Sequence, residues 1–392
     1  SRAVKYLAQT PEASLFHVWA DDIWGGGWTH EPGKEDYTAS DQALLVSNDL
    51  LRRLRKELPG ATLAFLAYHD TVYPPRVVKP DPGVIYFYAP RERCYGHALD
   101  SPDCPLNRKY SQALEQGLPA FGAANAEVFE YYVDQILYEN LTNPPLPEVL
   151  AADAKYYNRL GIPNVGALMT NTAEFLSPMV NMFLYPQALW NPQRDLNASL
   201  REYAQLYFGD AEVGKYFDEL KVGLMEVLKV CEYEIPGSAW DLLRVDQEKD
   251  EALQRHVERT EQALRGSLLK ADSILRAATS RAKGKYRTRL EGESKSMEFT
   301  MLQAKLYYHL LKGEQLYRTW KKQRNAEAGV GVLRESVLAR YTWENQKKLV
   351  ARAGIKGRPL IPDPAVLEER AKELVKAGYS IDRLDQHLAK AI

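Results

Sequence analysis

The sequence predicts an α/β region followed by an all-α region. Up to about residue 185, short β-rich apolar runs alternate with helical stretches, which is the pattern of βα units around a mainly parallel sheet. Beyond that point, nearly every segment carries apolar residues three and four positions apart, as amphipathic helices do. The chain has 392 residues, 45% of them hydrophobic and 26% charged, so it is long and apolar enough to bury sizeable cores.

Five strands are expected in the first region, and helices lie between them. The predicted strands are Leu15–Ala20, Thr62–Tyr68, Val84–Tyr88, Glu127–Tyr132 and Val165–Met169. The predicted helices of this region are Ser40–Glu57, Asn107–Gln116 and Pro147–Leu160. They precede the second, fourth and fifth strands, as helices do in successive βα units.

Five strands are too few for a complete barrel. A closed (βα)8 barrel of the TIM type has eight strands and typically about 250 residues. A short helical segment, Ala3–Ala13, precedes the first strand. This segment resembles the end of an earlier βα unit. We therefore expect residues 1–190 to form a TIM-barrel-like region with strands four to eight, the earlier units belonging to a missing N-terminal segment. The alternative is an open five-stranded sheet.

Residues 191–392 are predicted to form a C-terminal helical domain. Its expected helices are Leu196–Phe208, Ala211–Val230, Asp246–Lys283, Ser294–Arg324, Val330–Ala353 and Pro364–Lys376. An alternative makes this domain an interaction module with an apolar stripe near Tyr307, Tyr308, Leu311 and Trp320. Burial of these side chains against neighbouring helices would mean that the stripe is core, which is the reading we favour.

The charge balance argues against several classes of partner. Lys and Arg number 51 and Asp and Glu 52, so the net charge of -1 creates no general attraction for nucleic acid or anionic lipid. No apolar run reaches the length of about 18 residues that predicts a membrane span. We expect a soluble protein, with a secreted or periplasmic location slightly favoured over a cytoplasmic one. The sequence does not predict the oligomeric state.

Cofactor motifs are not found in the sequence. It has no phosphate-binding glycine loop, dinucleotide fingerprint or paired Cys-x-x-Cys. His17, His69 and His97 could join Asp21 and Asp70 around a metal ion, but this spacing is not diagnostic, and we predict neither a metal nor a cofactor. Among the three cysteines, Cys94 and Cys104 are close enough to close a loop disulfide, although free thiols are favoured.

The strongest functional signal is the segment WADDIWGGGW at the end of the first strand. Ligands of parallel βα folds bind beyond the C-terminal ends of the strands. Adjacent carboxylates such as Asp21 and Asp22 repel each other, so one should have a raised pKa and serve as an acid. Three glycines leave room for a bulky substrate, and Trp19, Trp24 and Trp28 offer flat faces for sugar rings. The alternative is structural, with Asp21 capping the loop and Asp22 in an ion pair.

The other strand ends add polar and aromatic residues. As substrate-binding residues we predict, besides the three tryptophans, Tyr68, His69, Tyr86, Tyr88, Glu130, Tyr132 and Asn171. Glu130 is also a reserve carboxylate for a nucleophile or base. Each tyrosine could instead be a half-buried ring with its hydroxyl bonded to backbone. A polar, aromatic cup without excess positive charge suits a neutral, polyhydroxylated ligand.

Several motifs resemble a known family. FHVWADDIWGGGW, AYHDTVYPP, ALWNP and YFGDA, in this order over roughly residues 14–220, resemble the domain-of-unknown-function 4838 group, part of which is classed as glycoside hydrolase family 163. The resemblance implies a TIM-type barrel that hydrolyses glycans containing N-acetylhexosamine. It also implies that Asp21 holds and polarises the substrate's acetamido group, which acts as nucleophile, while Asp22 is the general acid/base. GGGW stands where the family often has a cysteine-containing loop, so the subfamily stays open.

The prediction is therefore a retaining, N-acetylhexosaminidase-like glycoside hydrolase in which residues 1–190 are catalytic. Its partner is an oligosaccharide or glycoconjugate, and Asp21 and Asp22 form the working pair. The alternative is a noncatalytic carbohydrate-binding protein built on the same barrel. Sugar identity, linkage, anomer and exo or endo action are not predicted.

Overall fold

The computed structural model describes residues 2–19, 25, 28, 36–133, 144–169, 179–228, 249–353 and 363–380. The chain divides into two compact units. The sheet unit comprises Ser1–Tyr132, Glu148–Met169 and Tyr185–Arg194, and the helical unit comprises Val133–Pro147, Thr170–Leu184 and Asp195–Ile392.

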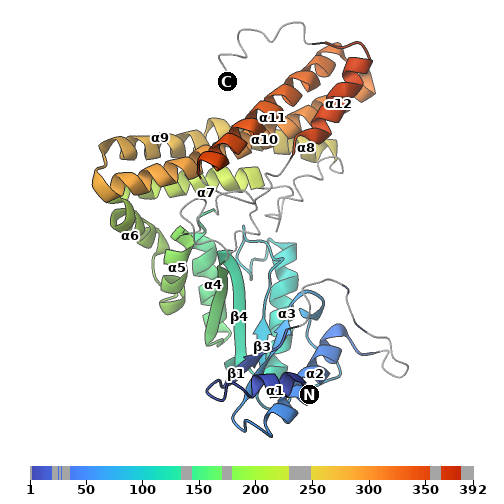
Figure 1. Ribbon diagram of the computed structural model, residues 1–392, viewed down its shortest axis with the longest axis vertical. Helices are drawn as coiled ribbons and strands as arrows, with labels where there is room; N and C mark the ends of the chain where they lie inside the picture. The colour runs from blue at the N-terminus through green and yellow to red at the C-terminus, as the bar shows by residue number, and fades with distance from the viewer. Residues whose placement is uncertain are drawn as a thin grey trace. The chain divides into compact units, whose positions relative to one another are not determined.

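The sheet unit is built on one curled, parallel sheet of five strands, consistent with part of an α/β barrel (Figure 1). The strands are β1 (Leu15–His17), β2 (Thr62–Ala67), β3 (Val84–Tyr88), β4 (Ala126–Val133) and β5 (Asn164–Met169), and they neighbour one another in this order. Phe16 pairs with Leu63, Phe65 with Tyr86, and Tyr88 with Val128. All five predicted strands are confirmed, although β1 ends earlier than expected, at His17.

Helices connect the strands, as the βα pattern predicts. Helix α1 (Arg2–Leu7) precedes β1, whereas α2 (Ala39–Leu54), α3 (Pro105–Phe121) and α4 (Pro147–Arg159) lie between strands, with short 3-10 turns η1 (His69–Thr71) and η2 (Ala123–Asn125). Helix α2 begins with a capping box, because the Thr38 hydroxyl accepts a hydrogen bond from the Asp41 N–H and the Asp41 carboxylate accepts one from the Thr38 N–H. Helix α3 begins after Cys104 with a proline in its first turn, where no N–H is needed.

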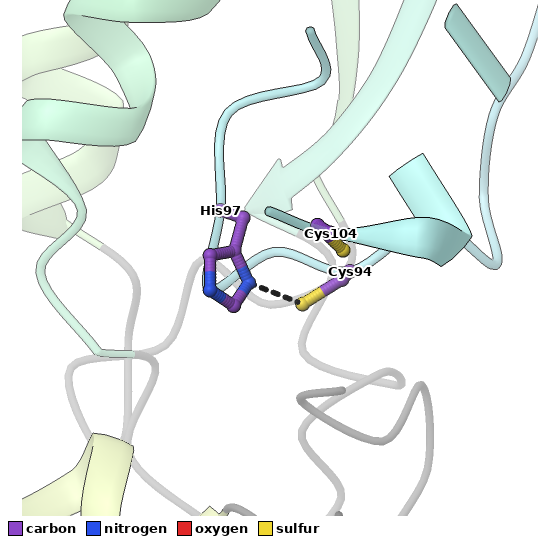
Figure 2. Close-up of side chains that lie close together, drawn as sticks. All are labelled: Cys94, His97 and Cys104. Carbon is purple, nitrogen blue, oxygen red and sulfur yellow. Dashed lines mark hydrogen bonds between the residues drawn. The ribbon is translucent and has the colours of Figure 1, made fainter. Parts of the chain in front are cut away.

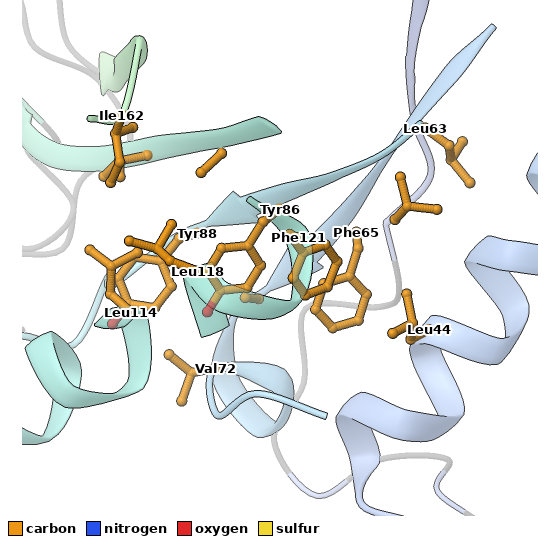
Figure 3. Close-up of a cluster of buried hydrophobic side chains, with 14 of the residues drawn as sticks. Leu44, Leu63, Phe65, Val72, Tyr86, Tyr88, Leu114, Leu118, Phe121 and Ile162 are labelled. Atoms are coloured by element: carbon orange, nitrogen blue, oxygen red, sulfur yellow. The ribbon is translucent and has the colours of Figure 1, made fainter. Parts of the chain in front are cut away.

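The core of the sheet unit lies between the sheet and helices α2 and α3 (Figure 3). Alternate strand residues point toward the helices, so Phe65 and Tyr86 pack together and against Phe121 of α3. The ring centroids of Tyr86 and Phe121 are 4.8 Å apart. A Cβ atom at Gly117 would lie 2.5 Å from the Tyr86 hydroxyl oxygen, so this close approach of helix to sheet requires glycine.

The described residues of the helical unit form helices that pack side by side. They are α6 (Leu196–Phe208), η3 (Ala211–Val213), α7 (Gly214–Leu228), α8 (Asp250–Arg265), α9 (Ser267–Arg281), α10 (Gly284–Gln323), α11 (Ala326–Arg352) and α12 (Ala365–Lys376). The longest, α10, packs along α11 (Figure 1). Tyr307, Leu311 and Trp320 of α10 are buried, and Tyr308 is partly buried against a cluster of Leu253, Val257 and Leu311, so the apolar stripe noted in the sequence is core.

Two differences from the expected helices have local causes. The single helix expected over 246–283 is divided into α8 and α9 at Gly266, whose backbone (φ -107°, ψ -102°) is not helical. Helix α5 (Met179–Trp190) is not among the predicted helices, because apolar residues occur on all its sides and leave no amphipathic period to detect. In the described part of the chain, no helix is long and apolar enough to cross a membrane.

Candidate functional site

One pocket of about 230 Å3 lies at the C-terminal ends of β1 and β2. Trp19 and Trp28 line it from the chain that follows β1, and Tyr68, His69 and Asp70 line it from the chain that follows β2. Helix α2 closes one side with small and apolar residues. The structure thus brings together four of the side chains singled out in the sequence, with Asp70 beside them, at the edge where parallel βα folds bind ligands.

A strained turn aims the residues that follow β2 into this pocket. His69 has a φ of +49°, in the left-handed region that residues other than glycine rarely adopt. The Thr71 hydroxyl stabilises the turn, because it donates to the Leu66 carbonyl (2.8 Å) and accepts from the Tyr68 N–H (3.1 Å). Strain of this kind is concentrated at functional sites, where surrounding contacts hold it in place.

Asp70 connects the chain after β1 to the end of β2. Its Oδ2 atom accepts hydrogen bonds from the Gly25 N–H (2.5 Å) and from Nε1 of Trp28 (3.0 Å). Gly25 has a φ of +66°, which glycine adopts without a steric penalty. The indole N–H of Trp28 is bonded to Asp70, so the Trp28 ring is held in one orientation at the pocket. In this orientation the ring can present an apolar face.

Trp19 lies on the face of the sheet opposite the helix-packed core. Its ring packs against Phe87 of β3 and Phe129 of β4, at centroid distances of 5.7 and 6.3 Å, and His17 meets its edge at 5.8 Å. Half of the Trp19 side chain remains exposed (50%). Aromatic contacts therefore hold the ring on this face of the sheet, and half of the side chain is exposed.

Glu92, in the loop after β3, adds a carboxyl group that the sequence analysis missed. Its Oε1 atom lies 3.4 Å from Nδ1 of His69 and 3.3 Å from Nη1 of Arg91. Burial raises the pKa of Glu92, and the nearby His69 and Arg91 only partly offset this effect. In the sequence Glu92 stands between two arginines, a pattern typical of an exposed ion pair, so no signal distinguished it.

The structure corrects the expectation for four other side chains. Tyr86, Tyr88, Glu130 and Tyr132 have no exposed surface and do not reach the pocket. They occupy alternate positions of β3 and β4 that face the helices, because successive strand residues point to opposite faces. Their hydroxyl and carboxyl groups are therefore part of the packed layer between sheet and helices, and not of the rim.

Glu130 belongs to a buried charge cluster. Nη1 of Arg93 lies 2.9 Å from Oε1 of Glu130 and 2.7 Å from Oδ2 of Asp153. The Tyr157 hydroxyl donates to Glu130, and the Tyr132 hydroxyl donates to Asp153. Burial raises the pKa of Glu130, and Arg93 opposes this effect. The cluster joins β4 to α4 and to the loop after β3, which is a structural role.

Four of the predicted site residues, Asp21, Asp22, Trp24 and Asn171, lie outside the described residues. Their proposed roles therefore rest on the sequence alone.

A second group of reactive side chains lies in the loop between β3 and α3 (Figure 2). Cys94 and Cys104 are buried thiols rather than a disulfide, as the sequence favoured, and Sγ of Cys94 lies 3.3 Å from Nδ1 of His97. A hydrogen bond with Cys94 lowers the pKa of the Cys104 thiol to about 6. Among the described residues, His17, His69 and Asp70 do not form a metal-ligand group with His97.

A larger cavity, of about 580 Å3, lies mainly beside the amino ends of β4 and β5, and Phe87 of β3 and Phe129 of β4 also line it. Its lining includes Glu127 at the start of β4 and Asn164 and Val165 at the start of β5. In parallel βα folds, residues at these amino ends serve stability rather than ligand binding. The smaller pocket at the carboxyl ends is therefore the better candidate for a functional site.

Comparison with known proteins supports the family resemblance over about half the chain. Residues 28–218 match the family model for Domain of unknown function (DUF4838). The DUF4838 match includes Trp28 and the residues that follow β2, and it ends within α7. It does not assign an activity. No curated protein matches the chain.

Among solved structures, the chain is similar to a GH138 enzyme targeting pectin rhamnogalacturonan II. The alignment covers 96% of this chain and 78% of that one, with a TM-score of 0.43 and 10% sequence identity. A likeness of this degree assigns neither a substrate nor a reaction to the present chain.

Proposed function

We propose that the sheet unit belongs to a retaining glycoside hydrolase that cleaves glycans containing N-acetylhexosamine. The observation that carries this proposal is the pocket at the ends of β1 and β2, which Trp19, Trp28, Tyr68 and Asp70 line together. Aromatic faces offer the apolar face of a sugar a surface on which to stack, and a carboxylate accepts hydrogen bonds from its hydroxyls. The sequence motifs that resemble the DUF4838 group imply this substrate class.

The working pair in this proposal is Asp21 and Asp22. In the sequence, both follow Trp19, which lines the pocket, and precede Gly25, which is hydrogen-bonded to Asp70. Asp22 protonates the oxygen of the leaving group and then, as a base, accepts a proton from the attacking water. Asp21 orients the acetamido group, whose carbonyl oxygen attacks the anomeric carbon, so two successive inversions retain its configuration.

Asp70 and Glu92 have different roles in this mechanism. Asp70 is a positioning residue, because its Oδ2 atom is already engaged by Gly25 and Trp28. Glu92 is a carboxyl group with a raised pKa next to His69, which makes it the competing choice for the proton donor.

Hydrolysis of aryl N-acetylhexosaminides by matched variants tests these roles. We expect Asp22→Asn to lower kcat by about 10²–10⁴-fold with folding intact, and Glu92→Gln to keep most of the activity. Asp21→Asn should reduce turnover of acetamido substrates most. Unchanged kinetics in Asp22→Asn, with turnover lost in Glu92→Gln, would remove Asp22 from the mechanism and assign the proton to Glu92.

The same preparations distinguish an enzyme from a carbohydrate-binding protein. Calorimetric binding of chitin fragments by the wild-type protein, without any cleavage after long incubation, would favour the noncatalytic alternative. Cleavage that depends on Asp22 would exclude it.

A further inference from the structure

The loop between β3 and α3 gathers three ligands of the kind that soft metal ions prefer. The Sγ atoms of Cys94 and Cys104 and a ring nitrogen of His97 all lie within 4.8 Å of one another (Figure 2). In tetrahedral zinc sites, bond lengths of about 2.3 Å to sulfur and about 2.0–2.1 Å to nitrogen place neighbouring ligand atoms roughly 3.5–3.8 Å apart. The distance of 3.3 Å between Cys94 Sγ and His97 Nδ1 is already close to that value.

Asn107, in the first turn of α3, holds this loop in place. Its side-chain oxygen accepts a hydrogen bond from the Cys94 N–H (2.7 Å). Its amide nitrogen donates to the carbonyl oxygens of Cys94 (2.9 Å), His97 (3.0 Å) and Ala98 (2.9 Å). Because Asn107 is fully buried, these bonds fix the backbone of two of the three ligands.

The buried charge cluster fixes the loop from the other side. Nη2 of Arg93 donates to the His97 carbonyl oxygen (2.8 Å), and Oδ1 of Asp153 accepts from the Leu99 N–H (2.6 Å). A backbone that is fixed in this way reduces the cost of assembling the ligands.

The position of each ligand also suits a metal ion. Cys104 is the N-cap of α3, where the partial positive charge of the helix end favours a thiolate. Both sulfur atoms belong to buried residues, which protects a metal–thiolate bond, whereas the half-buried His97 leaves a path for the ion to enter. Thiolate and imidazole ligands together are typical of zinc.

We propose that Cys94, His97 and Cys104 bind one Zn²⁺ ion that joins the loop after β3 to the first turn of α3. Three protein ligands leave the fourth tetrahedral position to water. The site is separate from the pocket at the ends of β1 and β2, and it replaces the sequence-based expectation that the chain holds no metal. It does not depend on the proposed glycosidase activity.

Metal analysis of the full-length, reduced protein tests this proposal. After incubation with ZnCl2 and dialysis, we expect one zinc per chain and protection of Cys94 and Cys104 from alkylation, which a chelator reverses. Replacement by Co²⁺ should produce thiolate-to-cobalt charge-transfer absorption. Zinc should also raise the Tm, because it binds the folded chain.

His97→Ala is the most informative variant. The hydrogen bonds that hold the loop use the His97 carbonyl oxygen, so they survive this substitution. We expect His97→Ala, Cys94→Ser and Cys104→Ser to weaken zinc binding at least about 10-fold with an unchanged circular dichroism spectrum. Cys231→Ser, the same change at the remaining cysteine, is the control and should keep one zinc.

Three results would overturn the proposal. The first is that the reduced wild-type protein retains no zinc. The second is that His97→Ala retains as much zinc as the wild type. The third is that the purified protein contains a Cys94–Cys104 disulfide in its resting state.

Discussion

The Nε1 atom of Trp28 donates a hydrogen bond to Oδ2 of Asp70 across 3.0 Å, and this bond joins two strand ends that are distant in the sequence. The same oxygen accepts the Gly25 N–H. One carboxylate thereby fixes both the backbone and an aromatic wall of the candidate pocket. Asp70 is not itself the reacting acid in this account, and its contribution to binding is the orientation of Trp28.

Removing that carboxylate should weaken ligand binding without unfolding the protein. We expect Asp70→Ala to raise the Kd for N-acetylglucosamine oligosaccharides about 10-fold, since a hydrogen bond to a charged group contributes about 1.5–3 kcal/mol. Asp70→Asn retains an acceptor oxygen and should have a smaller effect. Titration calorimetry measures both, and an unaltered Kd in Asp70→Ala would contradict a positioning role.

Each tryptophan of the pocket should contribute separately to sugar binding. Trp19→Ala and Trp28→Ala each remove an aromatic surface. We expect each variant to bind the sugar roughly 5–10-fold more weakly, which corresponds to a loss of about 1–1.5 kcal/mol in binding free energy. Trp190 at the end of α5 is 93% exposed and does not line the pocket, so Trp190→Ala is the matched control. Equal affinities in all three variants would place the ligand elsewhere.

The buried charge cluster should be important for stability. Arg93→Leu leaves Glu130 and Asp153 buried without their counter-charge, and we expect a loss of about 3–5 kcal/mol in the free energy of unfolding. The loss should become smaller as the pH falls, because burial raises the pKa of Glu130, and a protonated Glu130 no longer needs a counter-charge. Arg52→Leu removes an exposed pair with Asp81 and should change stability little in urea unfolding. Similar losses in both variants would contradict the structural role of Arg93.

Asp41 should make stability depend on acid. Burial raises its pKa, but hydrogen bonds from the N–H groups of Val78, Thr38 and Val77 and from the Thr38 hydroxyl outweigh burial, so the pKa is lowered. Stabilisation from a lowered pKa is present above the unfolded value and is lost as the pH falls through the folded value.

Asp41→Asn tests this dependence directly. We expect a deficit of about 2 kcal/mol at pH 7, which closes as the pH falls below about 4. Unfolding curves at several pH values measure it. Ser47→Ala, on the same helix, lacks only a local bond to the Ala43 carbonyl and serves as the control. A deficit that does not change with pH would show that the charge of Asp41 is not responsible.

The sequence allowed the strands to be predicted well, because their period and the turns before them are local properties. The end of β1 was less predictable, since only the structure shows that pairing stops at His17. Gly266 lies within a run of apolar residues that has the period of a single helix. A glycine inside such a run can either end the helix or be tolerated within it, and the sequence did not show which applied.

The candidate site was predicted in part. Tyr68 and His69 directly follow a strand, and strand-end position was sufficient to place them at the pocket with Trp19 and Trp28. Strand alternation alone did not show which residues of β3 and β4 face the helices, and this caused the error for Tyr86 and Glu130. Contacts between distant segments, such as that between Glu92 and His69, have no local signal.

Turnover of aryl glycosides that differ only in the substituent at the 2-position tests the central claim most directly. The account predicts hydrolysis of the 2-acetamido substrates with retained anomeric configuration, loss of turnover in Asp22→Asn, and little or no hydrolysis of the 2-hydroxyl analogues. Equal turnover of both substrate series, or no turnover of any glycoside by a folded wild-type protein, would contradict it.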